Sequence, residues 1–199
     1  MGVFPQSPQI IAHISVSPYF LFQLSFTASI DQYWLQLLTV YAIVSKNIDR
    51  YIGQVRKMGK MVVTFCGHRE VDPQDQVAEK LEAVIESLIA AGAEQFLLGG
   101  YGQFDWLAAR AVNRAKMFHP GIESILVIPY LDRNYDDALY DRTLYPSLEQ
   151  VPRRFAISRR NKYMVDAADV IVAYVIYDWG GAAGTLEYAK RRRKYIIYL

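Results

Sequence analysis

Cysteine and histidine are scarce in this chain, and their scarcity excludes several kinds of site. The one cysteine, Cys66, has no partner for an internal disulfide and cannot form a cysteine-based zinc site. The three histidines, His13, His68 and His119, are far apart and lack the spacing of a helical zinc motif. We therefore expect no metal site. We also expect a cytoplasmic protein, because a lone thiol is most easily kept in a reducing compartment.

A strong net charge is also missing. Twenty-two basic and 20 acidic residues leave a formal charge of +2, so the chain as a whole is not a polybasic nucleic-acid binder. Any anion-binding site must therefore be local, and a nucleic-acid partner is not expected from composition. Hydrophobic residues make up 52% and charged residues 21% of the chain, which is typical of a globular protein and argues against disorder.

The first sixty residues differ from the rest. Residues 10–30 contain no charged side chain, and with a second apolar run at residues 33–44 they raise the question of a membrane span. Polar residues interrupt both runs, and no basic segment precedes them as in a signal peptide. Three interpretations of residues 1–60 stay open: accessory helices, a membrane anchor, or upstream sequence before a misassigned start, since Met58 and Met61 both precede the first clear strand. Membrane contact is expected only if residues 10–30 span a bilayer.

From Met61 onward, apolar runs alternate with segments of helical periodicity. Each apolar run is followed within a few residues by glycine, proline or a polar cluster. We predict helices at 73–91, 104–118, 159–167 and 183–192, between strands at 61–66, 95–98, 124–128, 170–176 and 194–198. This order predicts a second domain, residues 61–199, with a Rossmann-like doubly wound α/β fold and a mainly parallel five-stranded sheet covered by helices on both faces. The stretch 130–158 is too long for a plain connection and suggests a lid or binding loop.

Residues that directly follow the strands are the candidates for ligand binding, because ligands of open parallel sheets bind outside the carboxyl ends of the strands. The turns at 99–102 and 180–184 are rich in glycine, and each opens a predicted helix. Free N–H groups and the positive end of the helix dipole favour a phosphate there. The predicted ligand-binding or phosphate-binding residues are Gly67, His68, Arg69, Gly99, Gly100, Gly102, Tyr130, Arg160, Asn161, Gly180, Gly181, Gly184 and Thr185.

Plainer interpretations of the same residues stay open. Glycines after strands also serve simply as turn formers. The basic run 190–194 ends a helix, where cations stabilise the negative end of the dipole, so we interpret it as a solvated helix end rather than a nucleic-acid patch. Asp105 and Glu187 are the carboxylates best placed for catalysis or for contact with a ribose, although Asp105 also suits the first turn of its helix without any function.

Four motifs together resemble the SLOG superfamily, and most closely its branch of YpsA-like proteins, which carry a similar Gly-His-Arg after the first strand. They are Thr64-Phe-Cys-Gly-His-Arg69, Leu98-Gly-Gly-Tyr-Gly-Gln-Phe-Asp105, Arg160-Asn-Lys-Tyr-Met-Val-Asp166, and Gly180-Gly-Ala-Ala-Gly-Thr185 with Tyr188-Ala-Lys190. The resemblance covers about residues 61–199. It implies a Rossmann-like fold that binds nucleotides or nucleotide-derived ligands at the glycine turns.

The same superfamily contains the LOG phosphoribohydrolases, whose signature Pro-Gly-Gly-x-Gly-Thr-x-x-Glu ends in a catalytic glutamate. Here Trp179 stands in place of the proline, an extra residue separates Gly181 from Gly184, and Glu187 comes one position early. One residue rotates a helical side chain by about 100°, which predicts that Glu187 faces away from the ligand. The superfamily also contains DNA-processing proteins that act on single-stranded DNA.

Three functions follow as hypotheses. The first is a non-catalytic or sensory nucleotide-binding module for a ligand of the AMP, NAD or ADP-ribose type, with no other cofactor implied. The second is an N-glycosidic hydrolase acting on a nucleoside monophosphate or an NAD-like substrate, with Glu187 or Asp105 as the catalytic carboxylate. The third is a single-stranded DNA-binding protein. The sequence leaves the oligomeric state open, and a homo-oligomer is compatible with it.

Overall fold

Strands and helices alternate along residues 60–199, which are the part of the chain that the computed structural model describes. The interpretations of residues 1–59, including the span at 10–30, lie outside these residues. Within the described part, no helix is both long and apolar enough to cross a bilayer.

The sheet has six strands, all parallel, in the spatial order β4-β3-β2-β1-β5-β6. Their bounds are β1 Met61–Gly67, β2 Ala93–Leu98, β3 Glu123–Val127, β4 Arg142–Leu144, β5 Val170–Tyr174 and β6 Tyr195–Tyr198. The longer helices are α3 Val77–Ala90, α4 Gly102–Lys116, α5 Ala156–Ala167 and α6 Gly180–Arg191. Two short 3-10 turns complete the described part, η2 Pro73–Asp75 and η3 Arg153–Phe155.

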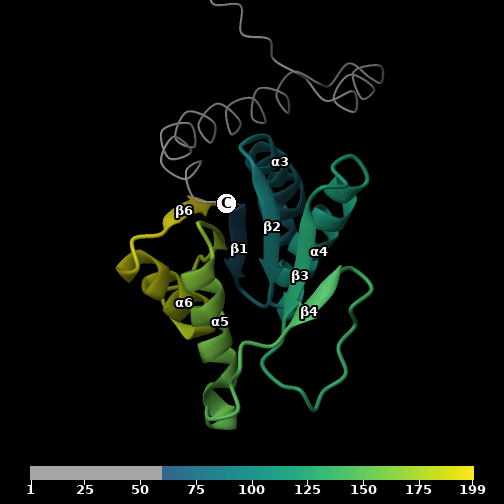
Figure 1. Ribbon diagram of the computed structural model, residues 1–199. Coiled ribbons are helices and arrows are strands. Elements are labelled where there is room, and N and C mark those ends of the chain that lie inside the picture. Colours follow the sequence, from purple (N-terminus) through teal and green to yellow (C-terminus); the bar gives the residue numbers. More distant parts are fainter. Residues whose placement is uncertain (1–59) are drawn as a thin grey trace, which may run out of the picture. The chain divides into compact units, whose positions relative to one another are not determined.

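Helices cover both faces of this sheet, as the near-continuous apolar strands require. On one face, α3 and α4 pack on side chains such as Val63, Phe65 and Phe96, and on the other face α5 and α6 pack on Cys66 and Ile171 (Figure 1). The chain builds the sheet outward from β1 to β4 and then returns to add β5 on the other side of β1. The predicted Rossmann-like doubly wound fold is confirmed.

The sequence-based prediction was wrong in the number of strands and in the starts of the helices, which lie at Val77, Gly102, Ala156 and Gly180. It gave five strands, because β4 is a three-residue edge strand, Arg-Thr-Leu, with exposed side chains and too short for any periodicity. It also began a helix at Pro73, where the structure has the 3-10 turn η2. Asp72 caps that turn by accepting a hydrogen bond from the Gln74 N–H, but Gln76 then takes a left-handed conformation (φ 50°) and α3 starts after it.

Candidate functional site

The strand order reverses at β1, which lies between β2 and β5. The chain leaves β2 toward α4 on one face and leaves β5 toward α6 on the other face. The loops that follow β1, β2 and β5 therefore meet at one edge of the sheet, at the position where open α/β sheets bind ligands. The predicted glycine turns belong to two of these three loops.

A cavity of about 80 Å³ opens at this edge. It brings together six of the predicted site residues, which come from β1, the β2–α4 turn, α4, α5 and α6: Gly67, Gly99, Asp105, Arg160, Asn161 and Thr185. Ligand pockets of drug size usually measure about 300–1,000 Å³. The cavity therefore has room for a phosphate-sized group, and a larger ligand would have to extend beyond it.

Arg160 is the most unusual residue of the cavity, because its side chain is only 1% exposed. Its Nη1 donates hydrogen bonds to the carbonyl oxygens of Gly99 (2.5 Å) and Val127 (3.0 Å), at the ends of β2 and β3. Its Nε is buried and has no hydrogen-bond partner in the described part of the chain. A buried charged donor without a partner is costly, so this atom is a candidate contact for an anionic or polar ligand group.

Asp105 stands next to Arg160 in the first turn of α4. Its Oδ2 accepts a hydrogen bond from the Tyr101 N–H (2.9 Å), which fixes the turn between β2 and α4. Burial raises the pKa of the Asp105 carboxyl, and the positive charge of Arg160 offsets part of that increase. Gly99 makes room for the pair, since a Cβ there would lie 2.5 Å from both Arg160 Nη1 and Asp105 Oδ2.

The first turn of α6 forms another wall of the cavity. The sequence placed the start of this helix at residue 183, whereas it starts at Gly180, after a Trp179 that provides no side-chain cap. Trp179 therefore offers no side-chain oxygen to the first N–H groups of α6, and a helix start of this kind favours an anion. Thr185 Oγ1 donates to the Gly181 carbonyl (2.8 Å) and accepts from Asn161 Nδ2 (3.2 Å), so it ties α6 to α5 beside the cavity.

His68 lies beside the cavity and holds the loop after β5. Its Nε2 lies 3.0 Å from the Ile176 N and 3.1 Å from the Tyr177 N, so it accepts from both N–H groups and its proton must be on Nδ1. Burial lowers the pKa of His68, in agreement with a ring that must stay neutral to accept these bonds. Only Nδ1 is left for the ligand contact predicted from the sequence.

This arrangement predicts an acid-sensitive loop. Because the pKa of His68 is lowered on folding, its stabilising contribution is complete above the ordinary histidine pKa of about 6.5 and is lost as the pH falls below it. We expect the free energy of unfolding to decrease modestly between pH 7 and pH 5, and to decrease less in His68→Gln. Urea unfolding of both proteins at each pH measures the difference, and equal pH profiles would contradict the role of His68.

The remaining predicted residues do not line the cavity. Arg69 is exposed, and its backbone packs on Gly102, where φ is +89° and a Cβ would lie 2.8 Å from Arg69 Cα. The Tyr130 ring lies in the long loop between the Arg133 and Arg153 guanidinium groups. Glu187 is 61% exposed at its side chain and pairs with Lys190 (2.6 Å). Gly100, Gly180, Gly181 and Gly184 shape the two turns and the start of α6.

Several cavity residues were not predicted as site residues. They are Thr64, Phe65, Cys66, Tyr101, Ile157, Met164, Val165 and Ala182. Cys66 was expected to be a buried strand residue, and this is confirmed: its Sγ donates to the Ala182 carbonyl, and burial raises the pKa of its thiol to about 12. A thiol with this pKa is protonated at neutral pH and is a poor nucleophile.

Sequence comparison finds two curated relatives, and no model of a known protein family matches the chain. An uncharacterized SPbeta prophage-derived protein, YoqJ, from Bacillus subtilis is 28% identical over 142 residues, which cover 58% of this chain and 81% of that protein. The UPF0398 protein BH1768 from Halalkalibacterium halodurans is 28% identical over 133 residues, which cover 59% and 69%.

Several solved structures share the fold. DNA processing protein A from Streptococcus pneumoniae matches with a TM-score of 0.54 at 20% identity, over 70% of this chain and 50% of that protein, so the chain spans about half its length. The molybdenum cofactor carrier protein from Chlamydomonas reinhardtii matches with a TM-score of 0.50 at 17% identity, over 70% and 76%. These matches show the Rossmann-like fold that the resemblance to the SLOG superfamily implies.

Proposed function

We propose that residues 61–199 form a domain that binds a nucleotide or nucleotide-derived ligand of the AMP, NAD or ADP-ribose type, with a phosphate group in the cavity. The observation that carries this proposal is the buried Nε of Arg160, which has no partner among the described residues, in a cavity whose wall includes Ala182 and Thr185 of α6. A guanidinium and free helix N–H groups together select for a phosphate. The size of the cavity leaves the nucleoside outside, over the edge of the sheet.

The molybdenum cofactor carrier protein and DNA processing protein A support this proposal only through the fold that they share with this chain. The first, by its name, carries a molybdenum cofactor, and DNA processing protein A from Helicobacter pylori binds single-stranded DNA.

Thermal unfolding of the full-length protein with AMP, NAD and ADP-ribose tests the proposal. A ligand at a hundred times its dissociation constant should stabilise the protein by about 2.7 kcal/mol. Thr185→Val keeps the shape of the side chain but removes the hydroxyl that ties α6 to α5 at the wall of the cavity, so we expect about tenfold weaker binding, worth about 1.4 kcal/mol. Thr143→Val, the same change on the exposed edge strand β4, is the matched control and should bind normally. The proposal fails if none of the three compounds stabilises the protein.

N-glycosidic hydrolysis is the second candidate, and one observation favours it. Among the described residues that line the cavity, Asp105 is the carboxylate, and burial raises its pKa as a general acid requires. Glu187, the counterpart of the LOG glutamate, points into solvent instead. Chromatography of the same AMP and NAD incubations for released free base separates hydrolysis from binding alone.

A further inference from the structure

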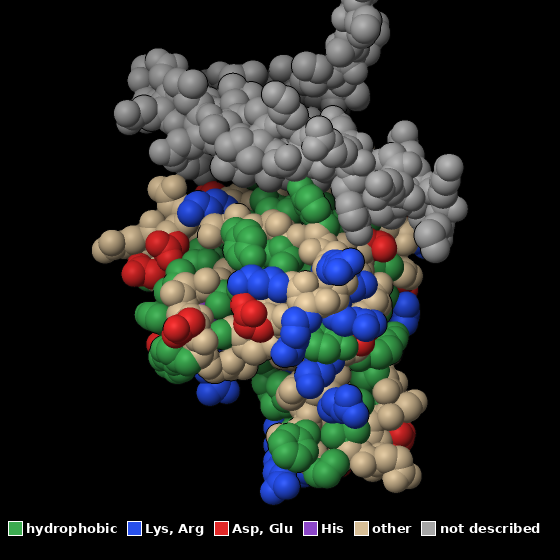
Figure 2. Space-filling view, turned by 90° about the vertical axis from the view of Figure 1, so that its left-hand side faces the viewer, with side chains coloured by type: hydrophobic (Ala, Val, Ile, Leu, Met, Phe, Trp, Pro, Cys, Tyr) green, Lys and Arg blue, Asp and Glu red, His purple; other side chains and the backbone are tan. Residues whose placement is uncertain are grey.

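Charge differs between the two sides of the sheet edge that holds the cavity. Figure 2 looks onto the side where α5 and α6 lie and shows Lys and Arg side chains gathered there. The connection from β3 to β4, residues 128–141, instead contains four aspartates and one arginine. A ligand with an anionic end and a neutral end is therefore expected to place its anion toward α5 and α6 and its neutral part toward this connection.

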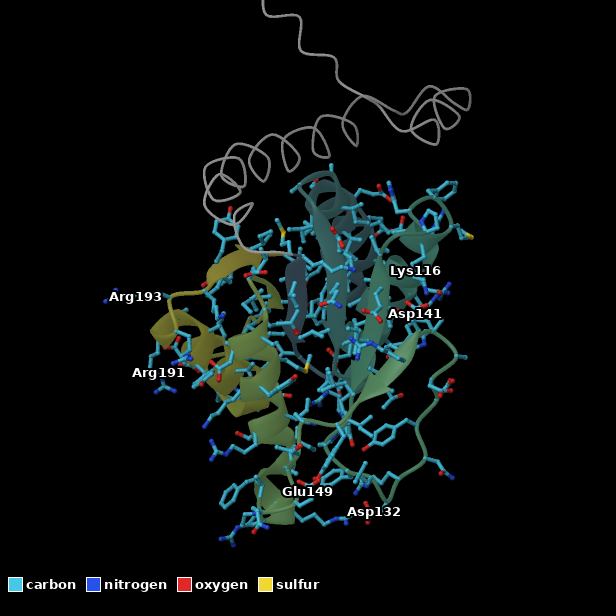
Figure 3. All side chains as sticks on the ribbon, viewed as in Figure 1. Lys116, Asp132, Asp141, Glu149, Arg191 and Arg193 are labelled. Atoms are coloured by element: carbon cyan, nitrogen blue, oxygen red, sulfur yellow. The ribbon has the colours of Figure 1, made fainter. Side chains whose placement is uncertain are left out.

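The β3–β4 connection starts at the same edge as the cavity, because all strands of the sheet are parallel. Near its start, Asp132 pairs with Arg153 (2.6 Å). At its end, Asp141 Oδ2 accepts a hydrogen bond from the Ser124 N–H (2.8 Å), and the Asp141 carboxylate pairs with Lys116 (Figure 3). Both ends of the connection are thus held, and the residues between them have defined positions.

Tyr135, in the middle of this connection, has a buried hydroxyl with no hydrogen-bond partner among the described residues. Burial, and next the nearby Tyr101 side chain, raise the pKa of Tyr135 to about 12, so the phenol is neutral at physiological pH. A neutral phenol can donate one hydrogen bond and accept others. Since a buried polar group without a partner destabilises the free protein, this hydroxyl is a candidate contact for a polar group of a ligand.

Tyr101 connects this hydroxyl to the cavity. Its side chain lines the cavity, and the guanidinium carbon of Arg160 lies 5.3 Å from the centroid of its ring. Tyr135 is close enough to Arg160 to act on the pKa of the guanidinium, as Tyr101 is. The two buried side-chain atoms without a partner among the described residues, Arg160 Nε and the Tyr135 hydroxyl, therefore belong to one site.

In a nucleotide, the group next to the phosphate is a ribose, whose hydroxyls donate and accept hydrogen bonds as a phenol does. We propose that the Tyr135 hydroxyl hydrogen-bonds to the ribose of a nucleotide whose phosphate occupies the cavity. This inference rests on the proposed function, which places the phosphate, and it adds a residue that recognises the sugar. The sequence predicted Tyr130 of the same connection instead, but the ring of that residue is held between two guanidinium groups.

Tyr135→Phe tests the contact, because loss of a hydroxyl without a partner affects binding but not the fold. We expect about tenfold weaker binding of AMP, NAD or ADP-ribose in isothermal titration calorimetry of the full-length protein. Without ligand, the urea midpoint should equal that of wild type or rise, since no hydrogen bond within the described residues is lost. Tyr198→Phe, which removes an exposed hydroxyl from the edge strand β6, is the matched control and should bind each compound as wild type does.

Dideoxy-AMP, which lacks both ribose hydroxyls, tests the sugar. Wild type should bind it about tenfold more weakly than AMP, whereas Tyr135→Phe should bind the two compounds within about twofold of each other, because the contact is missing in both cases. Thr185→Val should weaken the binding of both compounds, since it acts at the cavity that holds the phosphate.

The proposal is overturned if Tyr135→Phe binds the nucleotides as tightly as wild type does, or if wild type binds dideoxy-AMP as tightly as AMP. It is also overturned if the ligand-free midpoint of Tyr135→Phe falls below that of wild type, because the hydroxyl would then have a partner within the protein. If wild type binds none of AMP, NAD and ADP-ribose, the proposed function fails, and this proposal fails with it.

Discussion

Replacement of Arg160 with methionine is expected to lower the free energy of unfolding by about 3–5 kcal/mol, the largest effect of any single substitution considered for this protein. Methionine fills much of the same volume but donates no hydrogen bonds. The Gly99 and Val127 carbonyls then lose their common donor, and the Asp105 carboxylate loses the positive charge beside it. Urea unfolding followed by circular dichroism measures the loss.

A double variant shows how much of this effect comes from Asp105. Arg160→Met/Asp105→Asn removes the buried carboxyl that the first substitution leaves without a cation beside it, while asparagine can still accept from the Tyr101 N–H. We therefore expect the double variant to be more stable than the sum of the two single losses predicts, by about 0.5–3 kcal/mol. A loss below about 1 kcal/mol in Arg160→Met alone would show that the guanidinium contributes little to the fold.

Gly67→Ala is expected to cost about 3 kcal/mol, although it adds a single methyl group. A Cβ at Gly67 would lie 2.1 Å from Cδ1 of Phe104, a ring that is completely buried. The ring has little freedom to move away, because it stacks on Tyr174 with centroids 5.8 Å apart. The displacement that the added methyl group causes must therefore extend into the backbone of β1 or α4.

Gly121→Ala is the matched control for this substitution. It makes the same chemical change in the turn before β3, where a Cβ would meet no atom within 4 Å and φ is not positive. We expect its unfolding midpoint in urea to stay near that of wild type or to rise slightly, since alanine restricts the unfolded chain more than glycine does. Equal midpoints for the two alanine variants would mean that the domain accommodates the methyl group at Gly67 without strain.

The fold was largely predictable because its strands are buried on both faces. Runs such as Val170–Tyr174 are apolar throughout and too short for helices, and the helices between them show clear periodicity. Where side chains are exposed, the same signal fails. Arg142–Leu144 forms an edge strand whose existence depends on pairing with β3, and no local pattern in three residues encodes that pairing.

The candidate site was predictable in position but less so in chemistry. The sequence placed glycines at the correct sheet edge, yet the space at Gly67 is occupied by Phe104 rather than by a ligand. The dipeptide Arg159-Arg160 alone does not indicate which of the two arginines is buried. The helical spacing indicates it, because Ala156, Arg160 and Met164 recur every fourth residue and place Arg160 on the stripe of α5 that faces the sheet. A charged residue on a buried stripe is therefore the signal that the sequence offered for the most unusual residue of the cavity.

The position of β1 between β2 and β5 affects how the chain folds during synthesis. Val62 on β1 donates to Asp169 just before β5, and these two residues are 107 positions apart. At 5–20 residues per second, a ribosome takes roughly 5–20 s to make that segment. During this time β1 pairs with β2 on one side only, and its other edge offers free N–H and C=O groups to any neighbouring chain. Nascent chains of this protein are therefore expected to need protection from aggregation until β5 emerges, and codon changes that slow translation between β4 and β5 should lower the soluble yield.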